Sequence, residues 1–301
     1  MKLVTSDAYE VDLFGHVFPV EKYRLSRDEA LRRGIASEAD LVEAPRAGAE
    51  DVLLIHTREY FDDFINQRMT HRILRSEMAL TSEIVESFMV TAGGTIAAAR
   101  LALSDGICVH IGGGFHHAYP DHAEGFCYLN DVAIAIAVLR RDEKIQRACV
   151  IDCDLHQGNG TAFIFSQDPD VFTFSIHQEN NYPPKERSDL DIGLRDGAGD
   201  EEYLSELEVI SEILDSRQPS IVFYLAGADP FREDKLGGLH LSKSGLKKRD
   251  AMVFYECRKR EIPVCVVFAG GYALDIADDV DIHVNTIDQA RKAELKKGDR
   301  E

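Results

Sequence analysis

Apolar runs of four to six residues recur along the chain, and longer segments with helical periodicity separate them. Such short runs, rich in Val, Ile and Cys, predict buried strands. They lie at residues 2–5, 52–55, 107–111, 149–153, 171–176, 221–226 and 264–268. The helical patterns lie at residues 81–103, 130–141, 199–214 and 242–259. This alternation predicts an α/β fold in which a mainly parallel sheet is covered by helices on both faces.

The domain boundaries follow from what interrupts this pattern. No Pro/Ser/Gly-rich linker and no internal repeat divides the chain, so we expect a single domain over residues 1–290 and a charged tail over 291–301. Asn130 stands where a helix N-cap is expected. Residues 112–128 and 177–198 are predicted to be long loops, and long ordered loops are usually functional.

Composition narrows the classes of function. The net charge of −19 argues against direct binding of nucleic acid and favours cationic substrates such as lysine-rich peptides or polyamines. No apolar run reaches the ~20 residues that span a bilayer. The first ten residues lack a signal peptide's apolar stretch. The six cysteines lie mostly inside apolar runs, as expected of reduced core thiols, so we expect a cytoplasmic protein.

One strand-like run ends in a pattern suited to a metal. Asp152, Asp154 and His156 follow the run at 149–153 in strict alternation, so their side chains leave the strand on one side. Carboxylate and imidazole are normal zinc ligands, and a catalytic site takes about three of them from the protein. The alternative is an N-capping Asp beside a surface His.

A second run ends in a pair of histidines. Three glycines follow residues 107–111 and release the chain into a loop that carries His116 and His117. Both rings can then face one cavity, which suits a general acid/base pair near neutral pH. The alternative is one core ring and one surface ring.

Two further runs lead to Asp229 and Tyr272. Asp229 follows the run at 221–226, and Tyr272 follows the run at 264–268 after two glycines. Ligands bind at the carboxyl ends of strands in α/β sheets. The alternative for Tyr272 is a core ring beside a glycine turn.

With these motifs in hand, the chain resembles the histone deacetylase-like amidohydrolases of the arginase/deacetylase fold. The matching segments fall in the family's order at residues 112–118, 125–131, 152–160, 227–229 and 270–272. The chain is most similar to the class IV deacetylases, which share the motifs at 15–19, 156–160 and 236–239. Arginases are less similar, because Gly158 stands at the position of their third metal ligand.

The resemblance implies a role for each site residue. It implies that Asp154, His156 and Asp229 bind one metal, zinc or alternatively Fe²⁺, and that Tyr272 donates its hydroxyl to the substrate carbonyl. It pairs His116 with Asp152, and His117 with Asn159, where many family members have Asp. Because Asn is uncharged, we expect His117 to be the less basic ring and to act as the general base. A monovalent cation site for K⁺ is also implied, at Asp152, Asp154, His156, Ser175 and Ile176.

The resemblance also implies a narrow acyl-lysine tunnel. Its walls match Gly125, Phe126, Tyr182 and Leu236, with Phe126 and Tyr182 facing each other; a loop-anchoring ring is the alternative for Tyr182. Residues 66–76 contain no acid where peptide-binding relatives carry Asp, which argues against histone-type docking. The glycines after Leu236 predict free volume beside the tunnel, and class IV relatives are associated with long fatty acyl groups, so we expect activity to rise with acyl length.

We therefore interpret the chain as a metal-dependent amidohydrolase that removes an acetyl or longer fatty acyl group from a lysine ε-amine. The substrate would be an acyl-lysine peptide or an acylated polyamine. Alternatives are an acetylpolyamine deacetylase, an arginase-like ureohydrolase and a catalytically silent acyl-lysine binder. No feature of the sequence indicates an oligomeric state.

Overall fold

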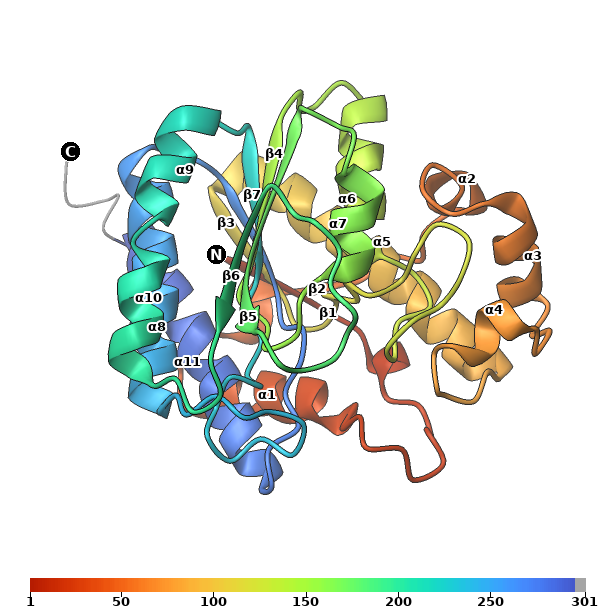
Figure 1. The fold of residues 1–301 in the computed structure, drawn as a ribbon, viewed down its shortest axis with the longest axis horizontal. Coiled ribbons are helices and arrows are strands. Elements are labelled where there is room, and N and C mark those ends of the chain that lie inside the picture. Colours follow the sequence, from red (N-terminus) through yellow and green to blue (C-terminus); the bar gives the residue numbers. More distant parts are fainter. Residues whose placement is uncertain (296–301) are drawn as a thin grey trace.

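A sheet of eight strands, all parallel, forms the centre of the computed structural model, which describes residues 1–295 (Figure 1). The spatial order is β2-β1-β3-β8-β7-β4-β5-β6, and each adjacent pair runs parallel. The strands are β1 (Lys2–Thr5), β2 (Leu41–Glu43), β3 (Ile107–His110), β4 (Ala148–Asp152), β5 (Val171–Gln178), β6 (Leu190–Leu194), β7 (Ile221–Leu225) and β8 (Val264–Val267). The α/β fold expected from the sequence is confirmed.

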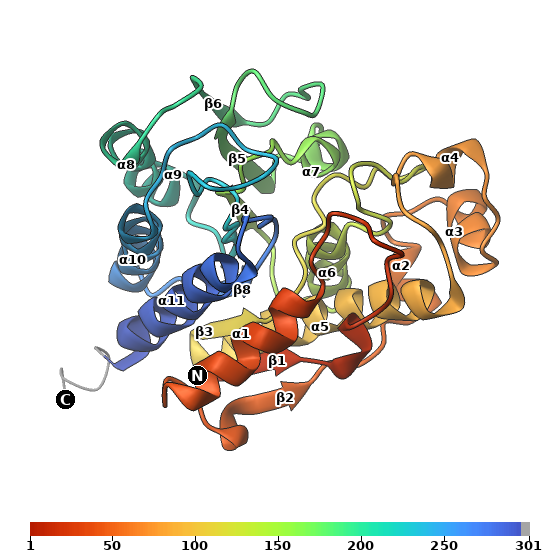
Figure 2. The same ribbon diagram turned by 90° about the horizontal axis from the view of Figure 1, so that it is seen from below.

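Helices cover both faces of this sheet. One face carries α1, α8, α9, α10 and α11, and the other carries α5, α6 and α7 (Figure 2). Short helices α2, α3 and α4 extend beyond α5 and α6 at one end. The helices are α1 (Glu21–Arg32), α2 (Ala49–Val52), α3 (Arg58–Ile65), α4 (His71–Leu74), α5 (Ser82–Asp105), α6 (Asp131–Arg141), α7 (Asn159–Phe165), α8 (Asp200–Leu207), α9 (Ile210–Arg217), α10 (Lys243–Lys259) and α11 (Ile276–Leu295).

Several elements differ from the sequence-based prediction. The strand expected at 52–55 is wrong, because Val52 ends helix α2 and the following apolar residues form turns. The helix expected at 199–214 is two helices, α8 and α9. Strands β2 and β6 were missed, because both are short edge strands: β2 has three residues, none of them buried, and β6 has five, of which only Leu194 is buried. Strand β6 lies inside the segment expected to be a loop at 177–198.

Helix α5 is the long apolar helix of the core. By length and composition alone it could cross a membrane, but 78% of its most apolar 18-residue window is buried in the fold, as in a soluble protein's core helix. A side chain at Gly94 would lie 2.6 Å from the hydroxyl of Tyr9, and one at Gly93 would overlap Pro45. The glycine pair therefore permits close packing of α5 against these residues.

Two remaining expectations concern the cysteines and the chain end. All six cysteines are buried and free, as expected of core thiols. Helix α11 continues past residue 290 to Leu295. Residues 296–301 of the expected tail lie outside the described residues.

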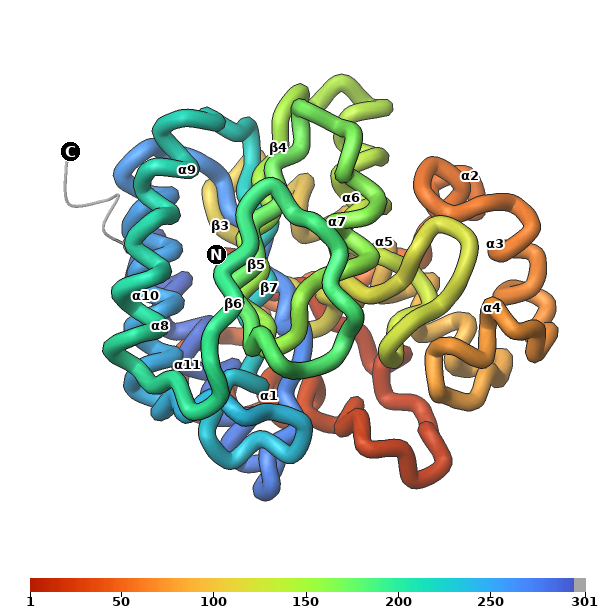
Figure 3. Tube along the Cα trace, viewed as in Figure 1, coloured from red at the N-terminus to blue at the C-terminus, as the bar shows by residue number. Residues whose placement is uncertain are grey.

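The loops at the carboxyl ends of the strands gather on one side of the molecule. The amino-terminal loop, red in Figure 3, lies beside the loop that follows β3, and the ring of His16 packs edge-on against Phe126 with centroids 4.5 Å apart. This gathering of loops encloses the site described next.

Candidate active site

The four strands with reactive ends are neighbours in the sheet. Strands β3, β8, β7 and β4 are consecutive in the spatial order, and all four are parallel. Parallel strands end at the same edge, so the residues that follow them are brought together. The structure places the side chains of these four segments in one buried cluster: Asp152, Asp154, His156, His116, His117, Asp229 and Tyr272.

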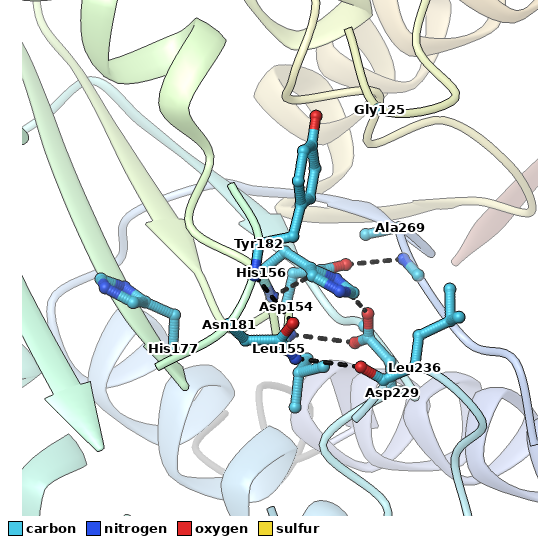
Figure 4. A network of polar contacts seen from close by, with 12 residues as sticks. Gly125, Asp154, Leu155, His156, His177, Asn181, Tyr182, Asp229, Leu236 and Ala269 are labelled. Carbon is cyan, nitrogen blue, oxygen red and sulfur yellow. Dashed lines mark hydrogen bonds and ion pairs between the residues drawn. The ribbon is translucent and has the colours of Figure 1, made fainter. Parts of the chain in front are cut away.

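Asp154, His156 and Asp229 form a compact group of metal-ligating side chains. One ligand atom from each residue lies within 4.8 Å of the other two. His156 Nδ1 lies 3.3 Å from Asp154 Oδ1 and 3.3 Å from Asp229 Oδ2 (Figure 4). Only 7% of His156 is exposed, so the alternative of a surface histidine is wrong.

The group has the chemistry of a divalent cation site. Asp229 Oδ2 is buried and accepts no hydrogen bond within residues 1–295; its ion-pair contact is with His156 Nδ1 at 3.3 Å. Burial and then the neighbouring Asp154 raise the pKa of Asp229 to about 7. A side chain at Gly270 would collide with Asp229 Oδ2, so glycine is needed for this close approach. Two carboxylates and an imidazole that converge in this way fit a bound metal ion.

His116 is paired with a carboxylate, as expected. Its Nδ1 lies 2.7 Å from Asp152 Oδ2, and both side chains are buried. Burial lowers the pKa of His116, but Asp152 and then Asp154 raise it, to about 9. His116 is therefore an imidazolium at neutral pH.

His117 has an uncharged partner instead. Its Nδ1 lies 2.7 Å from Asn159 Oδ1, and its Nε2 lies 3.1 Å from His116 Nε2. Burial lowers the pKa of His117 well below its usual range, and the charges of His116 and His156 lower it further. His117 is therefore neutral at pH 7, and the alternative of one core and one surface ring is wrong because both rings are buried.

Tyr119 holds the amide of Asn159, a contact that the sequence analysis missed. Asn159 Nδ2 donates to the Tyr119 hydroxyl at 3.2 Å, which in turn donates to Glu186 Oε1 at 3.2 Å. This arrangement turns the Asn159 carbonyl oxygen towards His117, so His117 Nδ1 carries the proton and Nε2 is the unprotonated nitrogen, which faces His116 Nε2 at 3.1 Å. Tyr119 lies two residues after His117, but no local pattern marks this contact.

Tyr272 lies at the other side of the cluster. It is 6% exposed, and its backbone amide donates to Asp234 Oδ2 at 2.7 Å. Its ring packs edge-on against Phe18 and Phe126. Burial, and then the charges of Asp154 and Asp229, raise the pKa of Tyr272 well above its usual range. The hydroxyl therefore stays protonated and can donate.

A cavity of about 290 Å³ leads to this cluster. Its lining comprises Glu77, His117, Gly125, Phe126, His156, Asn181, Tyr182, Leu236 and Tyr272. It includes all four residues expected to wall a tunnel. Tyr182 packs edge-on against His117, with centroids 5.3 Å apart, and Phe126 packs against Tyr272.

Glu77 places an acid on this cavity, where the sequence analysis expected none. It stands one residue beyond the acid-free segment 66–76, and its backbone has a positive φ of 62°. The basic segment before it forms α4 and its flanking turns. Sequence position alone did not indicate Glu77 as a cavity residue, because it reaches the cavity through the conformation of its turn.

Side chains of the cluster also line a second, much smaller inner cavity of about 20 Å³, together with Phe18, Phe115 and Gly114. This is room for one or two water molecules. A side chain at Gly237 would lie 2.9 Å from the Asp229 carbonyl oxygen, and one at Gly238 would lie 2.6 Å from Gln178 Nε2. These glycines are therefore packed against other atoms, and the free volume expected beside the tunnel is absent at both positions.

The residues expected at a monovalent cation site are also close together. Ser175 stands opposite Asp152 in the β4–β5 register, and Ile176 follows it on β5. Ser175 Oγ lies 2.9 Å from His177 Nδ1. His177 projects away from the Asp154–His156–Asp229 group (Figure 4).

Comparison with known sequences places this geometry in a family context. The family model for the histone deacetylase domain matches residues 16–287. An uncharacterised protein of Picosynechococcus is 38% identical over 89% of this chain and 90% of its own length. A probable deacetylase of Methanothermobacter thermautotrophicus is 32% identical over 90% of this chain and 86% of its own length. Histone deacetylase 2 of Arabidopsis thaliana is 29% identical over 93% of this chain and 78% of its own length.

Solved structures share the fold. The HDA15 HD domain superposes with a TM-score of 0.82 at 21% identity, covering 98% of this chain and 91% of that chain. An HDAC homologue from Aquifex aeolicus gives 0.81 at 23% identity, covering 97% of this chain and 84% of that chain. An HDAC homologue complexed with SAHA gives 0.82 at the same identity and coverage. At these identities the similarity supports the fold.

Proposed function

Because this chain belongs to the histone deacetylase family, we propose that it is a zinc-dependent amidohydrolase that removes a short acyl group from a lysine ε-amine. One observation carries the proposal. A buried Asp154–His156–Asp229 group lies beside the His116–His117 pair and Tyr272 at the base of a cavity of about 290 Å³.

Asp154, His156 and Asp229 would hold the metal, for which zinc is proposed and Fe²⁺ is the alternative. The bound metal would polarise the amide carbonyl and acidify a water molecule. The further cation site at Asp152, Asp154, His156, Ser175 and Ile176 is proposed for K⁺.

The two histidines would divide the proton transfers. His117 is neutral with an unprotonated Nε2, so it can accept a proton from the attacking water and later deliver it to the leaving amine. His116 holds a positive charge next to it, supported by Asp152. That charge would stabilise the negative charge that develops on the carbonyl oxygen.

Tyr272 would donate its hydroxyl to the same oxygen. Its raised pKa keeps the proton in place through the reaction, and its packing against Phe18 and Phe126 fixes the ring. Loss of one such donor typically lowers the rate by about 10²–10³-fold.

The cavities bear on the substrate. The outer cavity suits the methylenes of a lysine side chain, between the rings of Tyr182 and Phe126. The inner cavity of about 20 Å³ supports an acetyl group rather than a long fatty chain, which would require Phe18 and Phe115 to move. The similarity to class IV deacetylases and a cytoplasmic location remain part of this proposal.

The alternatives make different chemical demands. An arginase-like site needs a third acidic ligand near residue 158, but a side chain at Gly158 would collide with Asp152 and lie 3.1 Å from His116 Nδ1. An acetylpolyamine remains an alternative substrate, because the carboxylate of Glu77, which lines the cavity, can attract a second ammonium group of the polyamine. A silent binder is disfavoured because the His–His–Tyr groups required for turnover are all in place.

The proposed function is tested with the zinc-loaded full chain and a fluorogenic acetyl-lysine peptide, with N-acetylputrescine and arginine as parallel substrates. Turnover of the peptide with about one zinc per chain is the expected result. Turnover of N-acetylputrescine alone would move the assignment to polyamines. Two metals per chain with urea release would support a ureohydrolase, and binding of the peptide without turnover would support a silent binder.

A further inference from the structure

A buried arginine reaches the strand ends that carry the carboxylates of the site. Arg249 lies on α10 and is 0% exposed; it is the largest fully buried side chain of the described residues. A buried guanidinium is costly unless it is paired and hydrogen-bonded. None of the chemistry proposed above uses it, so its position requires an explanation.

Arg249 donates to the two backbone segments that precede the proposed metal ligands. Its Nη1 lies 2.6 Å from the Gly227 carbonyl oxygen and 3.3 Å from the Cys153 carbonyl oxygen. Cys153 directly precedes Asp154, and Gly227 stands two residues before Asp229. One nitrogen therefore links the two segments that deliver carboxylates to the site.

These segments lie at the end of the sheet, where few backbone hydrogen bonds remain: Cys153 N still donates to the Leu225 carbonyl oxygen at 3.1 Å, and Ala228 N donates to the Gly270 carbonyl oxygen at 2.9 Å. The β4–β7 ladder ends at the pair Asp152 and Leu225, so Cys153 and Gly227 follow the last paired residues of their strands. Beyond a ladder, backbone position depends on individual contacts. The hydrogen bonds from Arg249 supply such contacts to both segments.

A small shift of Gly227 would disturb the ligands directly. A side chain built on Gly227 would lie 2.6 Å from Asp229 Oδ1 and 2.9 Å from the Cα of Asp154. The backbone of this segment is therefore packed against both carboxylate residues. Ligand atoms must be held to within a few tenths of an ångström for tight metal binding.

Asp250 and its neighbours hold the guanidinium in place. Asp250 Oδ1 accepts from Arg249 Nε at 2.9 Å and lies 2.8 Å from Nη2. The hydroxyl of Tyr224 on β7 donates to the same oxygen, and Thr286 on α11 donates to Asp250 Oδ2 at 2.7 Å. The Arg249 side chain is thus fixed by three elements of the core, with its Nη1 aimed at the strand ends.

We propose that Arg249 is a positioning residue of the metal site, which sets the spacing between the Asp154 and Asp229 segments so that both carboxylates reach one ion. The inference rests on the proposed function only in that the Asp154–His156–Asp229 group binds a divalent metal. A purely structural ion pair would stabilise the fold without affecting metal affinity, and this difference can be measured.

The experiment compares Arg249→Met and Arg249→Lys in the full chain with Val253→Ala. Val253 is fully buried one turn further along α10, so its truncation lowers stability without touching the strand ends. Zinc affinity is measured by competition with a chromophoric chelator, and Co²⁺ binding by its visible absorption spectrum. We expect Arg249→Met to weaken zinc binding by about 10–100-fold and to change the Co²⁺ spectrum. Arg249→Lys should give a smaller loss, and Val253→Ala should leave affinity and spectrum unchanged.

The outcomes separate this inference from the proposed function. The positioning role would be overturned if folded Arg249→Met bound zinc with wild-type affinity. It would also be overturned if Val253→Ala, at the same Tm as Arg249→Met, lost as much zinc affinity. If Arg249→Met does not fold, Arg249→Lys decides: unchanged affinity overturns the role, and a loss beyond that of Val253→Ala supports it. Failure of the wild-type chain to bind zinc would instead overturn the proposed metal site itself.

Discussion

His117 Nδ1 lies 2.7 Å from the amide oxygen of Asn159, an uncharged partner, in the same cluster where a carboxylate faces His116. Two adjacent residues of one loop therefore differ in charge at neutral pH: His117 is neutral and His116 is a cation. Burial and neighbouring charges lower the pKa of His117, whereas Asp152 raises that of His116 to about 9. A base and a cation can therefore act side by side in one buried site.

Asn159→Asp should raise the pKa of His117, because a carboxylate stabilises the protonated ring. His117 must be neutral to accept a proton, so the acidic limb of the kcat/KM profile should move to higher pH and activity at pH 7 should fall. The measurement is the pH profile of both proteins on one acetyl-lysine peptide. An acidic limb that stays in place or moves to lower pH would show that residue 159 does not tune the base.

Tyr119→Phe should lower kcat by about 2–10-fold with little change in KM, corresponding to the loss of one hydrogen bond. Without the hydroxyl, the Asn159 amide is no longer held with its oxygen towards His117. Phe163→Ala is the control, because Phe163 packs on the Tyr119 ring, with centroids 5.1 Å apart, and its apolar side chain cannot take part in these hydrogen bonds. Equal effects of the two variants on kcat would mean that only the packing of Tyr119 matters.

The His116–Asp152 pair should make stability depend on pH. The pKa of His116 is raised to about 9 in the folded protein, above its unfolded value of about 6.5. The pair therefore contributes stability that is fully present below pH ~6.5 and is lost as the pH rises through about 9. In metal-free protein this amounts to at most about 3 kcal/mol. Urea unfolding at pH 6, 8 and 10 should show a smaller loss in Asp152→Asn than in the wild type. A loss from His156 remains in both proteins, because burial lowers its pKa but Asp154 and Asp229 raise it, to about 10. Parallel curves for the two proteins would contradict the assignment.

The sequence predicted which side chains gather at the strand ends better than it predicted the edges of the fold. Asp154, His156 and Asp229 lie together because each follows a buried strand, and neighbouring parallel strands end together. Their role as metal ligands was implied by the family resemblance and stays a prediction. The Asn130 N-cap of α6 was also predicted, and its side chain accepts from Ala133 N. Such local signals carry to the folded state because strand ends and helix caps depend on few distant contacts.

What the sequence missed depends on contacts between distant segments. Arg249 meets Cys153 and Gly227 from far along the chain, and no periodicity marks such a meeting. Glu77 reaches the cavity because its own turn has an unusual φ. The packing that fills the space at Gly237 likewise comes from Leu155 and Asp229, so glycine content alone overstated the room beside the tunnel.

Acyl length should reflect the small inner cavity. We expect kcat/KM to fall from acetyl to octanoyl on one peptide, because the inner cavity at the cluster is only about 20 Å³. Phe18→Ala should raise the octanoyl-to-acetyl ratio, since Phe18 lines this cavity. A monotonic rise of kcat/KM with chain length in the wild type would instead support the long-acyl expectation drawn from the sequence.

The central claim is that Asp154, His156 and Asp229 hold the catalytic metal. Its most direct test measures the zinc content and acetyl-lysine turnover of Asp229→Asn after zinc reconstitution, with Asp63→Asn, a mostly buried carboxyl on α3, as the control. Asp229→Asn keeps the shape of the side chain but removes the charge of a carboxylate whose Oδ2 accepts no hydrogen bond within the described residues and lies 3.3 Å from His156 Nδ1. We predict about one zinc per chain and full turnover for the wild type and the control, and at least about a 100-fold loss of turnover with weakened zinc binding for a folded Asp229→Asn. Retention of more than about a tenth of wild-type turnover with zinc still bound to the variant would contradict the account.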